Sequence, residues 1–389
     1  MKNFRLALKA AVAAFAATLA SAASAAEPPL SLAQNGSFFV GGKMTEIDGR
    51  ATMVGHMYVE YMVPARKTRP WPIIFVHGGL RTGANFTSTL DGKEGWAQYF
   101  ARRGYAVYIV DQVGRGRSPI IEKAYGPARM GDARGVQKRY AQQEKHKLWP
   151  QAGLHAPWPG GGEMDSPWVM ALSASQAVEI ENFHTQQELN RDALVALVDR
   201  IGPSIILGHS QAGAFLWPVA DARPAAIKAI LAIEPNGPPV GAVDFVGAPD
   251  WFKYGSVALS YGVSDVPLTY SPPVKDASEL KFTQQEKPDG EGLVRCFEQV
   301  EPARQLPNLR DIPTLVLTSE ASYHAPYDHC TVKYLQRAGV TPTFIRLADL
   351  GIRGDSHVLM LEKNSRDIAA VIANWLAKHV PAGKKAAAR

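Results

Sequence analysis

Ser210 lies at the centre of the segment Gly-His-Ser-Gln-Ala-Gly, residues 208–213. A serine hydroxyl is a weak nucleophile that becomes reactive when a neighbouring base removes its proton. An apolar run at 205–207 precedes the segment, and another apolar stretch follows it. The small residues Gly208, Ala212 and Gly213 permit a strained turn between a strand and a helix. We therefore predict that Ser210 is a nucleophile at such a turn; the alternative is a serine that caps a helix.

Attack by Ser210 on a carbonyl carbon would create an oxyanion, which needs hydrogen-bond donors. The segment His77-Gly78-Gly79 directly follows an apolar run at 73–76, where a glycine-rich turn can expose backbone N–H groups. The N–H of Gln211, at the start of the helix after Ser210, is the expected second donor. The alternative is a tight glycine turn without a chemical role.

The base should be a histidine that follows Ser210 in the chain. His357 is the best placed, because it lies between the last predicted strand and the closing helix, in the segment GIRGDSHVLMLEKNS. His324 and His329 are alternatives near the end of the preceding strand.

A carboxylate should orient the ring of that histidine. Glu234 ends the run AILAIE, 24 residues after Ser210, and Glu320 follows the run TLVLTS one strand later. Asp355 is only two residues before His357 and is poorly placed to orient the ring. The residues alone leave the acid open between Glu234 and Glu320.

Alternating strands and helices are needed to bring these side chains together. Short apolar runs at 73–76, 106–110 and 205–207, and later runs in IKAILAIE, IPTLVLTSEA and PTFIRLADL, are typical of strands that are buried on both faces. Helical spacing is seen in 96–103, in NRDALVALVDRIG and in SRDIAAVIANWLAKHV. This order predicts an α/β fold with a mostly parallel central sheet and helices on both faces.

Two segments interrupt this order, at about residues 119–185 and 238–310. Both are too long to be plain loops, so we expect each to form its own structure or a lid. They contain aromatic residues that could line an apolar acyl or aryl pocket or only pack the lids: Trp149, Trp158, Trp251, Phe252 and Tyr254.

Taken together, these motifs resemble the α/β-hydrolase superfamily. The resemblance covers roughly residues 50–380 and rests on HGG after the third strand, DQVGRGRS after the fourth, GHSQAG, and the order Ser, acid, His. The segment DQVGRGRS itself is interpreted as a structural turn. GHSQAG, IEPNG and GDSHVLMLEKNS are similar to those of secreted bacterial esterases of the esterase 713 type. That subgroup implies Ser210 as nucleophile, Glu234 as acid, His357 as base, and Gly79 and Gln211 as oxyanion donors. In the superfamily the acid more commonly follows the next strand along the chain, which here ends before Glu320, so Glu320 stays the alternative.

The first residues predict a cleaved signal peptide at 1–26, with a basic start, an apolar run at 10–20 and the small residues Ala23-Ser24-Ala25. The apolar run is short for a membrane anchor, which is the alternative. The hydrolase domain would then be 27–389, in the periplasm or secreted. The formal net charge of +6 comes largely from this start and from the tail GKKAAAR. We therefore expect no nucleic-acid partner.

The two cysteines, Cys296 and Cys330, should meet an oxidising compartment, so we predict a disulfide between them; two free thiols are the alternative. No clustered pattern of cysteine and histidine predicts a zinc site. We expect no metal, no organic cofactor and no membrane span. A homodimer is left open.

The sequence therefore predicts a secreted serine hydrolase that cleaves small carboxylic esters, with an apolar or aromatic group in the substrate. Acyl transfer or cleavage of amides or lactones would use the same residues. A non-catalytic binding protein on a hydrolase scaffold is the third hypothesis.

Overall fold

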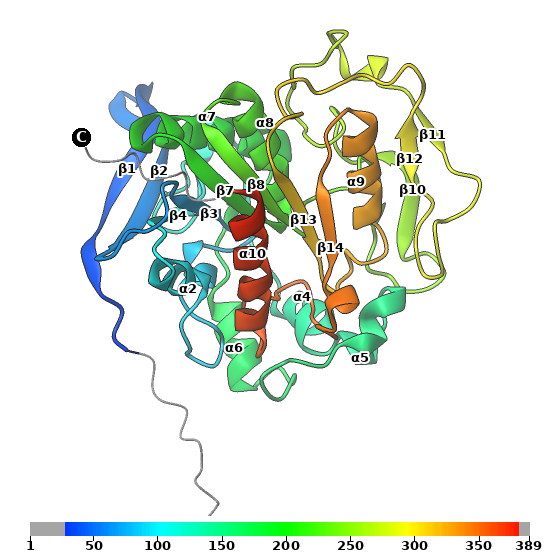
Figure 1. Cartoon of the computed structure of the whole chain (residues 1–389), viewed down its shortest axis with the longest axis horizontal. Helices are drawn as coiled ribbons and strands as arrows, with labels where there is room; N and C mark the ends of the chain where they lie inside the picture. Colours follow the sequence, from blue (N-terminus) through cyan, green and yellow to red (C-terminus); the bar gives the residue numbers. More distant parts are fainter. Residues whose placement is uncertain (1–27, 381–389) are drawn as a thin grey trace, which may run out of the picture.

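The computed structural model describes residues 28–380, and their central feature is an eight-stranded sheet in the order β1-β2-β4-β3-β7-β8-β13-β14 (Figure 1). β1 and β2 form an antiparallel hairpin, and β2 is also antiparallel to β4. The six strands from β4 to β14 are parallel. The fold class predicted from the sequence is therefore confirmed. The predicted signal peptide lies outside the described residues.

The six parallel strands of this sheet follow the predicted apolar runs closely. Their bounds are β1 Leu32–Ile47, β2 Arg50–Pro64, β3 Ile73–Val76, β4 Val107–Asp111, β7 Ser204–His209, β8 Ile227–Ile233, β13 Thr314–Thr318 and β14 Thr343–Arg346. The longer helices are α2 Trp96–Arg102, α7 Phe183–Ile201, α8 Gly213–Ala222, α9 Asp328–Arg337 and α10 Ser365–His379.

Both faces of the inner parallel strands β3, β4, β7, β8 and β13 are buried, which explains their continuous apolar runs. The edge strand β14 is only half-buried and its last residue is exposed, so the expectation that it is buried on both faces is wrong. Alternate residues point to opposite faces, so Ile74 and Ile206 lie in one core and Phe75 and Leu207 in the other. Helices α7, α8 and α9 cover the first face, and α2 and α10 cover the second. Figure 1 shows α7 and α8 on the opposite side of the sheet from α10. This double cover leaves the strand ends as the place for a site.

The two long segments that interrupt the alternation carry short elements. The first contains α3 Glu122–Tyr125, β5 Ala128–Arg129, α4 Ala133–Val136, a π-helical turn Gln137–Ala141, α5 Gln143–His146, a 3-10 turn Pro150–Leu154, α6 Pro167–Ala174 and β6 Glu179–Ile180. The second contains β9 Val240–Val243, β10 Phe252–Val257, β11 Phe282–Gln284 and β12 Phe297–Gln299. In Figure 1, α4 and α5 lie below the ends of β13 and β14, and β10, β11 and β12 lie beyond α9.

Cys296 and Cys330 form a disulfide between the segment just before β12 and helix α9, as predicted. Both cysteines are buried in a small core with Phe252, Val294 and Tyr327. Within residues 28–380, no helix combines the length and the apolar character needed to cross a bilayer.

Removing this disulfide should destabilise the protein. The bond closes a loop with a sequence separation of 34 residues, for which the loss of chain entropy in the unfolded state corresponds to about 4 kcal/mol. We expect the double variant Cys296→Ala, Cys330→Ala to lower the free energy of unfolding by about 2–4 kcal/mol in urea titrations. An unchanged urea midpoint would contradict this expectation.

Candidate active site

The candidate residues meet because they follow neighbouring parallel strands. Ser210 directly follows β7, Glu234 directly follows β8, and the turn His77-Gly78-Gly79 follows β3. These three strands are adjacent in the sheet, so their carboxyl ends lie at one edge. His357 reaches the same edge from the loop between β14 and α10.

The turn at Ser210 has the strained backbone that its sequence predicts. Ser210 has a φ angle of +57°, which is uncommon for a residue with a side chain. A Cβ atom on Gly213 would lie only 2.4 Å from Cβ of Pro235, and one on Gly78 would lie 3.0 Å from Cβ of Ser210. Glycine at both positions therefore lets three backbone segments pack closely around the serine.

Gly213→Ala provides a direct test of this packing. The added methyl group would overlap Pro235, and we expect it to destabilise the protein by about 1–3 kcal/mol and to lower activity as the turn shifts. Gly153→Ala is the matched control, because a Cβ at Gly153 meets nothing within 4 Å. Thermal unfolding of both variants measures the difference. Equal stability of the two variants would show that the close packing at Gly213 is not required.

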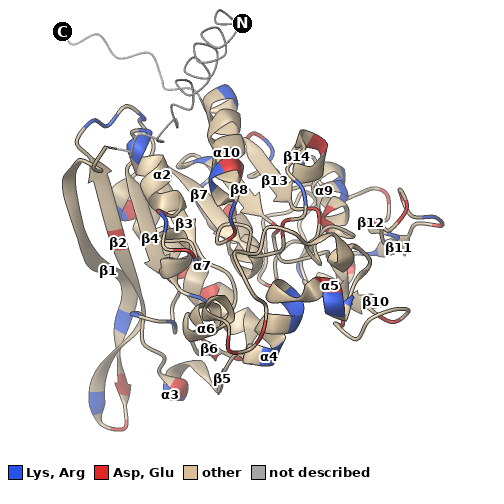
Figure 2. Ribbon diagram, turned by 90° about the horizontal axis from the view of Figure 1, so that it is seen from below, with Lys and Arg blue, Asp and Glu red and all other residues tan. Residues whose placement is uncertain are grey.

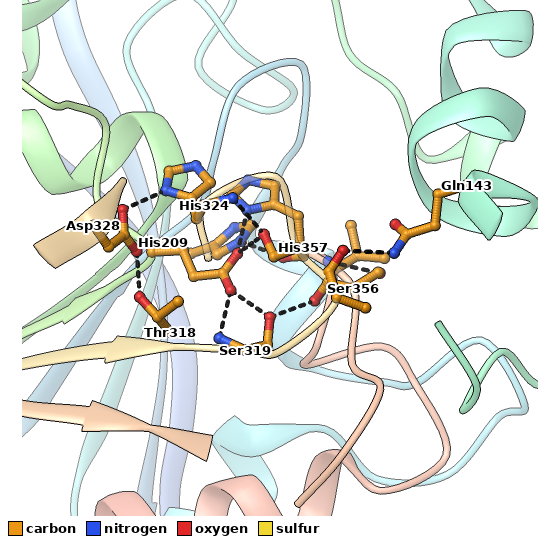
Figure 3. A network of polar contacts seen from close by, with 12 residues as sticks. Gln143, His209, Thr318, Ser319, His324, Asp328, Ser356 and His357 are labelled. Atoms are coloured by element: carbon orange, nitrogen blue, oxygen red, sulfur yellow. Dashed lines mark hydrogen bonds and ion pairs between the residues drawn. The ribbon is translucent and has the colours of Figure 1, made fainter. Parts of the chain in front are cut away.

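Glu234 and His357 form a buried pair, with 2.5 Å between Oε2 and Nδ1. Glu234 also accepts hydrogen bonds from the Ser319 backbone N–H at 2.8 Å and from the Ser322 hydroxyl at 2.7 Å. The Ser319 hydroxyl donates to the same carboxylate (Figure 3). This set of donors holds the carboxylate in one orientation.

The tautomer of His357 follows from this pairing, because a carboxylate can only accept a hydrogen bond. Nδ1 of His357 therefore carries the proton, which leaves Nε2 as an acceptor. The His209 ring donates from Nε2 to the backbone oxygen of His357 at 2.8 Å and fixes the loop. His357 and Ser210 line the same cavity, so the accepting nitrogen belongs to a ring beside the serine.

The surroundings of His357 favour its neutral form. Burial lowers its pKa well below the ordinary value, and the neighbouring His324, Arg139 and Arg81 lower it further. The His324 ring stacks on that of His357, with centroids 4.5 Å apart and planes 4° from parallel. A neutral imidazole can accept a proton, as a general base must.

The alternatives to Glu234 and His357 have other polar partners. Glu320 pairs with Arg353 at 2.6 Å and accepts from the backbone N–H of Gly354. His324 donates to Asp328 at 2.8 Å, and His329 lies 3.5 Å from Asp289. None of these three alternative residues lines the cavity at Ser210.

The glycine turn after β3 is held by hydrogen bonds to the Gly78 carbonyl. His77 Nδ1 donates to this oxygen at 2.9 Å, and Arg115 donates to it at 3.0 Å. The Gly78 carbonyl and the Gly79 N–H belong to the same peptide group, and in a trans peptide they point in opposite directions. The two hydrogen bonds to the carbonyl therefore also fix the direction of the Gly79 N–H. Within the described part of the chain, the Gly79 N–H has no hydrogen-bond partner. It is therefore available to a ligand in the cavity.

Arg115 connects the two expected oxyanion donors. Its guanidinium is buried, forms an ion pair with Glu179 and donates to the Gln211 side chain at 2.8 Å. Burial lowers the pKa of Arg115 to about 10. The segment DQVGRGRS is a turn, as the sequence indicates, but the contribution of Arg115 was missed. The sequence shows only an Arg-Gly-Arg pattern at this turn. The ion-pair partner of Arg115, Glu179, is 64 residues further along the chain, so no local pattern indicates the pair.

A cavity of about 350 Å³ opens at Ser210. Its lining includes Gly78, Gly79, Gln211, Asn236 and His357, and the aromatic residues Tyr140, Phe183 and Tyr323. The five aromatic residues that the sequence suggested for a pocket are not among the lining residues. Trp149 is buried with its Nε1 donating to the Ala321 carbonyl, and Phe252 packs in the core around the disulfide. Trp149 and Phe252 therefore pack within the protein and do not face Ser210.

Two clusters contain residue types that can bind metals, and other interactions occupy both. His209, Glu234 and His357 have ligand-type atoms within 4.8 Å of one another, but their hydrogen bonds join them to each other. In the second cluster, Cys296 and Cys330 are bonded to each other beside His329. The described residues thus offer no preformed set of unoccupied ligands in either place.

Comparison with known proteins agrees with this architecture. Residues 73–371 match the model of the alpha/beta hydrolase family. A curated relative, "Probable secreted lipase phiG" of Fungal sp. (strain ATCC 74256), is 38% identical over 342 residues, 88% of this chain and 89% of its own. A solved bacterial esterase is similar in fold, with a TM-score of 0.57 and 23% identity over 91% of this chain and 98% of its own. The chain belongs to the α/β-hydrolase family.

Proposed function

We propose that this protein is a secreted serine hydrolase that cleaves small carboxylic esters through an acyl-enzyme on Ser210. The observation that carries the proposal is the buried Glu234–His357 hydrogen bond, whose histidine lines one cavity together with Ser210 and Gly79. The sequence relative named a probable secreted lipase supports ester cleavage and secretion. The disulfide is compatible with an oxidising compartment such as the periplasm.

In the proposed mechanism, His357 Nε2 removes the proton from the Ser210 hydroxyl as its oxygen attacks the ester carbonyl. Glu234 holds the ring and stabilises its positive charge. The N–H groups of Gly79 and Gln211 bind the oxyanion, and each such donor is worth about 3–4 kcal/mol in enzymes where one was removed. His357 then protonates the departing alcohol. Water, activated by the same histidine, cleaves the acyl-enzyme and restores Ser210.

Rapid mixing with p-nitrophenyl butyrate tests this proposal. An acyl-enzyme that forms faster than it breaks down gives a burst of p-nitrophenol equal to the enzyme concentration. We expect turnover that depends on Ser210. A purified, folded protein without activity on short esters would instead favour a binding protein on a hydrolase scaffold.

Acyl transfer, or cleavage of an amide or lactone, remains the second candidate, because Ser210, Glu234 and His357 would act identically. Product analysis with a competing alcohol separates the two reactions. Mostly free acid identifies a hydrolase, and mostly the new ester identifies a transferase.

Activity should persist below the pH at which histidine usually becomes charged. Burial and nearby positive groups lower the pKa of His357, so its neutral, active form is retained as the pH falls. We expect the acid limb of kcat/KM to have its midpoint below about 6.5, the ordinary value for histidine. Arg139→Gln removes one of these charges and should move the midpoint upward. A wild-type midpoint above pH 7 would contradict the expectation.

A further inference from the structure

Two arginines of the Ser210 cavity have no acidic partner. Arg81 is buried, with 5% of its surface exposed, and Nη1 donates to the Leu172 carbonyl at 2.6 Å and to Ser175 Oγ at 3.0 Å. Arg139 is half-buried, and its Nε donates to the Gly135 carbonyl at 3.2 Å. Among residues 28–380, no carboxylate lies within ion-pair distance of either guanidinium.

Both guanidinium groups lie close to the reacting residues. The Tyr140 ring is 5.9 Å from the Arg81 guanidinium carbon and 5.5 Å from that of Arg139. Tyr140 lines the cavity, and its ring is stacked with that of His357 at 6.3 Å. Figure 2 shows blue Lys and Arg segments on α4 and α5, the helices on either side of the π-helical turn that holds Arg139.

Other charged groups of the cavity do not neutralise this pair. Arg129 lines the cavity but is paired with Glu179, which also pairs with Arg115. Glu181 is an exposed residue of the lining and forms no ion pair with Arg81 or Arg139. A positive excess therefore remains beside Ser210.

A buried charge without a partner is unfavourable, and the planar arginine fork matches the two oxygens of a carboxylate. We propose that Arg81 and Arg139 bind a carboxylate of the substrate, so that the preferred substrate is a small ester with a free carboxylate. This inference rests on the proposed ester hydrolysis at Ser210. The volume of about 350 Å³ suits a compact molecule, since ligand pockets start at about 300 Å³.

Two pairs of esters test the inference and distinguish where the carboxylate lies. On the alcohol side, 4-carboxyphenyl butyrate is compared with 4-tolyl butyrate. On the acyl side, monomethyl adipate is compared with methyl hexanoate. We expect kcat/KM to be on the order of tenfold to a hundredfold higher for the anionic member of at least one pair, as for a hydrogen-bonded charge. Comparable values in both pairs, or a preference for the neutral esters, would overturn the inference.

Variants connect that preference to the two arginines. Arg139→Gln and Arg81→Gln should reduce the ratio of anionic to neutral kcat/KM at least about tenfold. Lys138→Gln is the matched control, because Lys138 is the exposed neighbour of Arg139 and does not line the cavity. Arg139 is only half-buried, so we expect Arg139→Gln to fold. This variant tests the inference even if Arg81→Gln does not fold. An unchanged ratio in folded Arg139→Gln would reject the role of Arg139.

The outcomes separate this inference from the proposed function. Hydrolysis of neutral esters without any anionic preference rejects the carboxylate site and leaves ester hydrolysis standing. Absence of Ser210-dependent hydrolysis of all four esters rejects both.

Discussion

Ser210→Ala should lower kcat for p-nitrophenyl butyrate by about 10⁶-fold, the loss seen when the nucleophile of a serine hydrolase is removed. The alanine variant keeps the cavity, the proposed base His357 and the proposed oxyanion donors but has no oxygen that can attack the carbonyl. The residual rate above that of water should come from those remaining groups. Binding of a product analogue should change little, because the hydroxyl contributes to the chemical step.

The control for this variant is Ser173→Ala. The Ser173 hydroxyl is buried, has no hydrogen-bond partner among the described residues and does not line the cavity. We expect it to keep wild-type turnover. If folded Ser210→Ala retained wild-type turnover, the proposed mechanism would be wrong.

Glu234→Gln should lower kcat by about 10⁴-fold. Glutamine has nearly the shape of glutamate, but it removes the negative charge that stabilises the protonated ring. The glutamine amide can also donate a hydrogen bond to His357 Nδ1, which favours the tautomer with the proton on Nε2. A protonated Nε2 cannot accept the proton of Ser210. Ser319 donates to the other oxygen, Oε1, and should hold the glutamine carbonyl there, while the Ser322 hydroxyl loses its acceptor at Oε2. Circular dichroism checks that the variant is folded.

Glu320→Gln is the matched control, since Glu320 follows the neighbouring strand β13 and was the alternative acid. Its carboxylate pairs with Arg353 and the Gly354 N–H, away from His357. We expect kcat close to that of the wild-type enzyme. A loss confined to Glu320→Gln would assign the acid to the other strand and contradict the proposed roles of Glu234 and His357.

The strand order and the placement of Ser210, Glu234 and His357 could be predicted because each depends on local patterns. Buried parallel strands give apolar runs, and the chain direction sends the following residues to one edge of the sheet. The choice of Glu234 over Glu320 required more than the residues themselves, because both end adjacent strands. The contact of Glu234 with His357 depends on the path of the loop after β14.

The polar lining of the cavity could not be predicted in the same way. Arg81 and Arg139 come from segments 58 residues apart, and Arg139 lies in a short π-helical turn without a periodic pattern. The five aromatic residues that stood out by composition do not line the cavity. Trp149 and Trp158 are buried at 2% and 6% exposure. Composition therefore identified residues that pack the insertions, and the structure was needed to find those that face Ser210.

The measurement that tests the central claim most directly is labelling of the purified protein with a fluorophosphonate, followed by peptide mass spectrometry. Such a reagent modifies a serine that an adjacent base has activated. The account predicts one phosphonyl group per chain, on the peptide that contains Ser210, and loss of that label in His357→Gln. Absence of labelling in the wild-type protein, or labelling of a different residue, would contradict the assignment of Ser210 as the nucleophile.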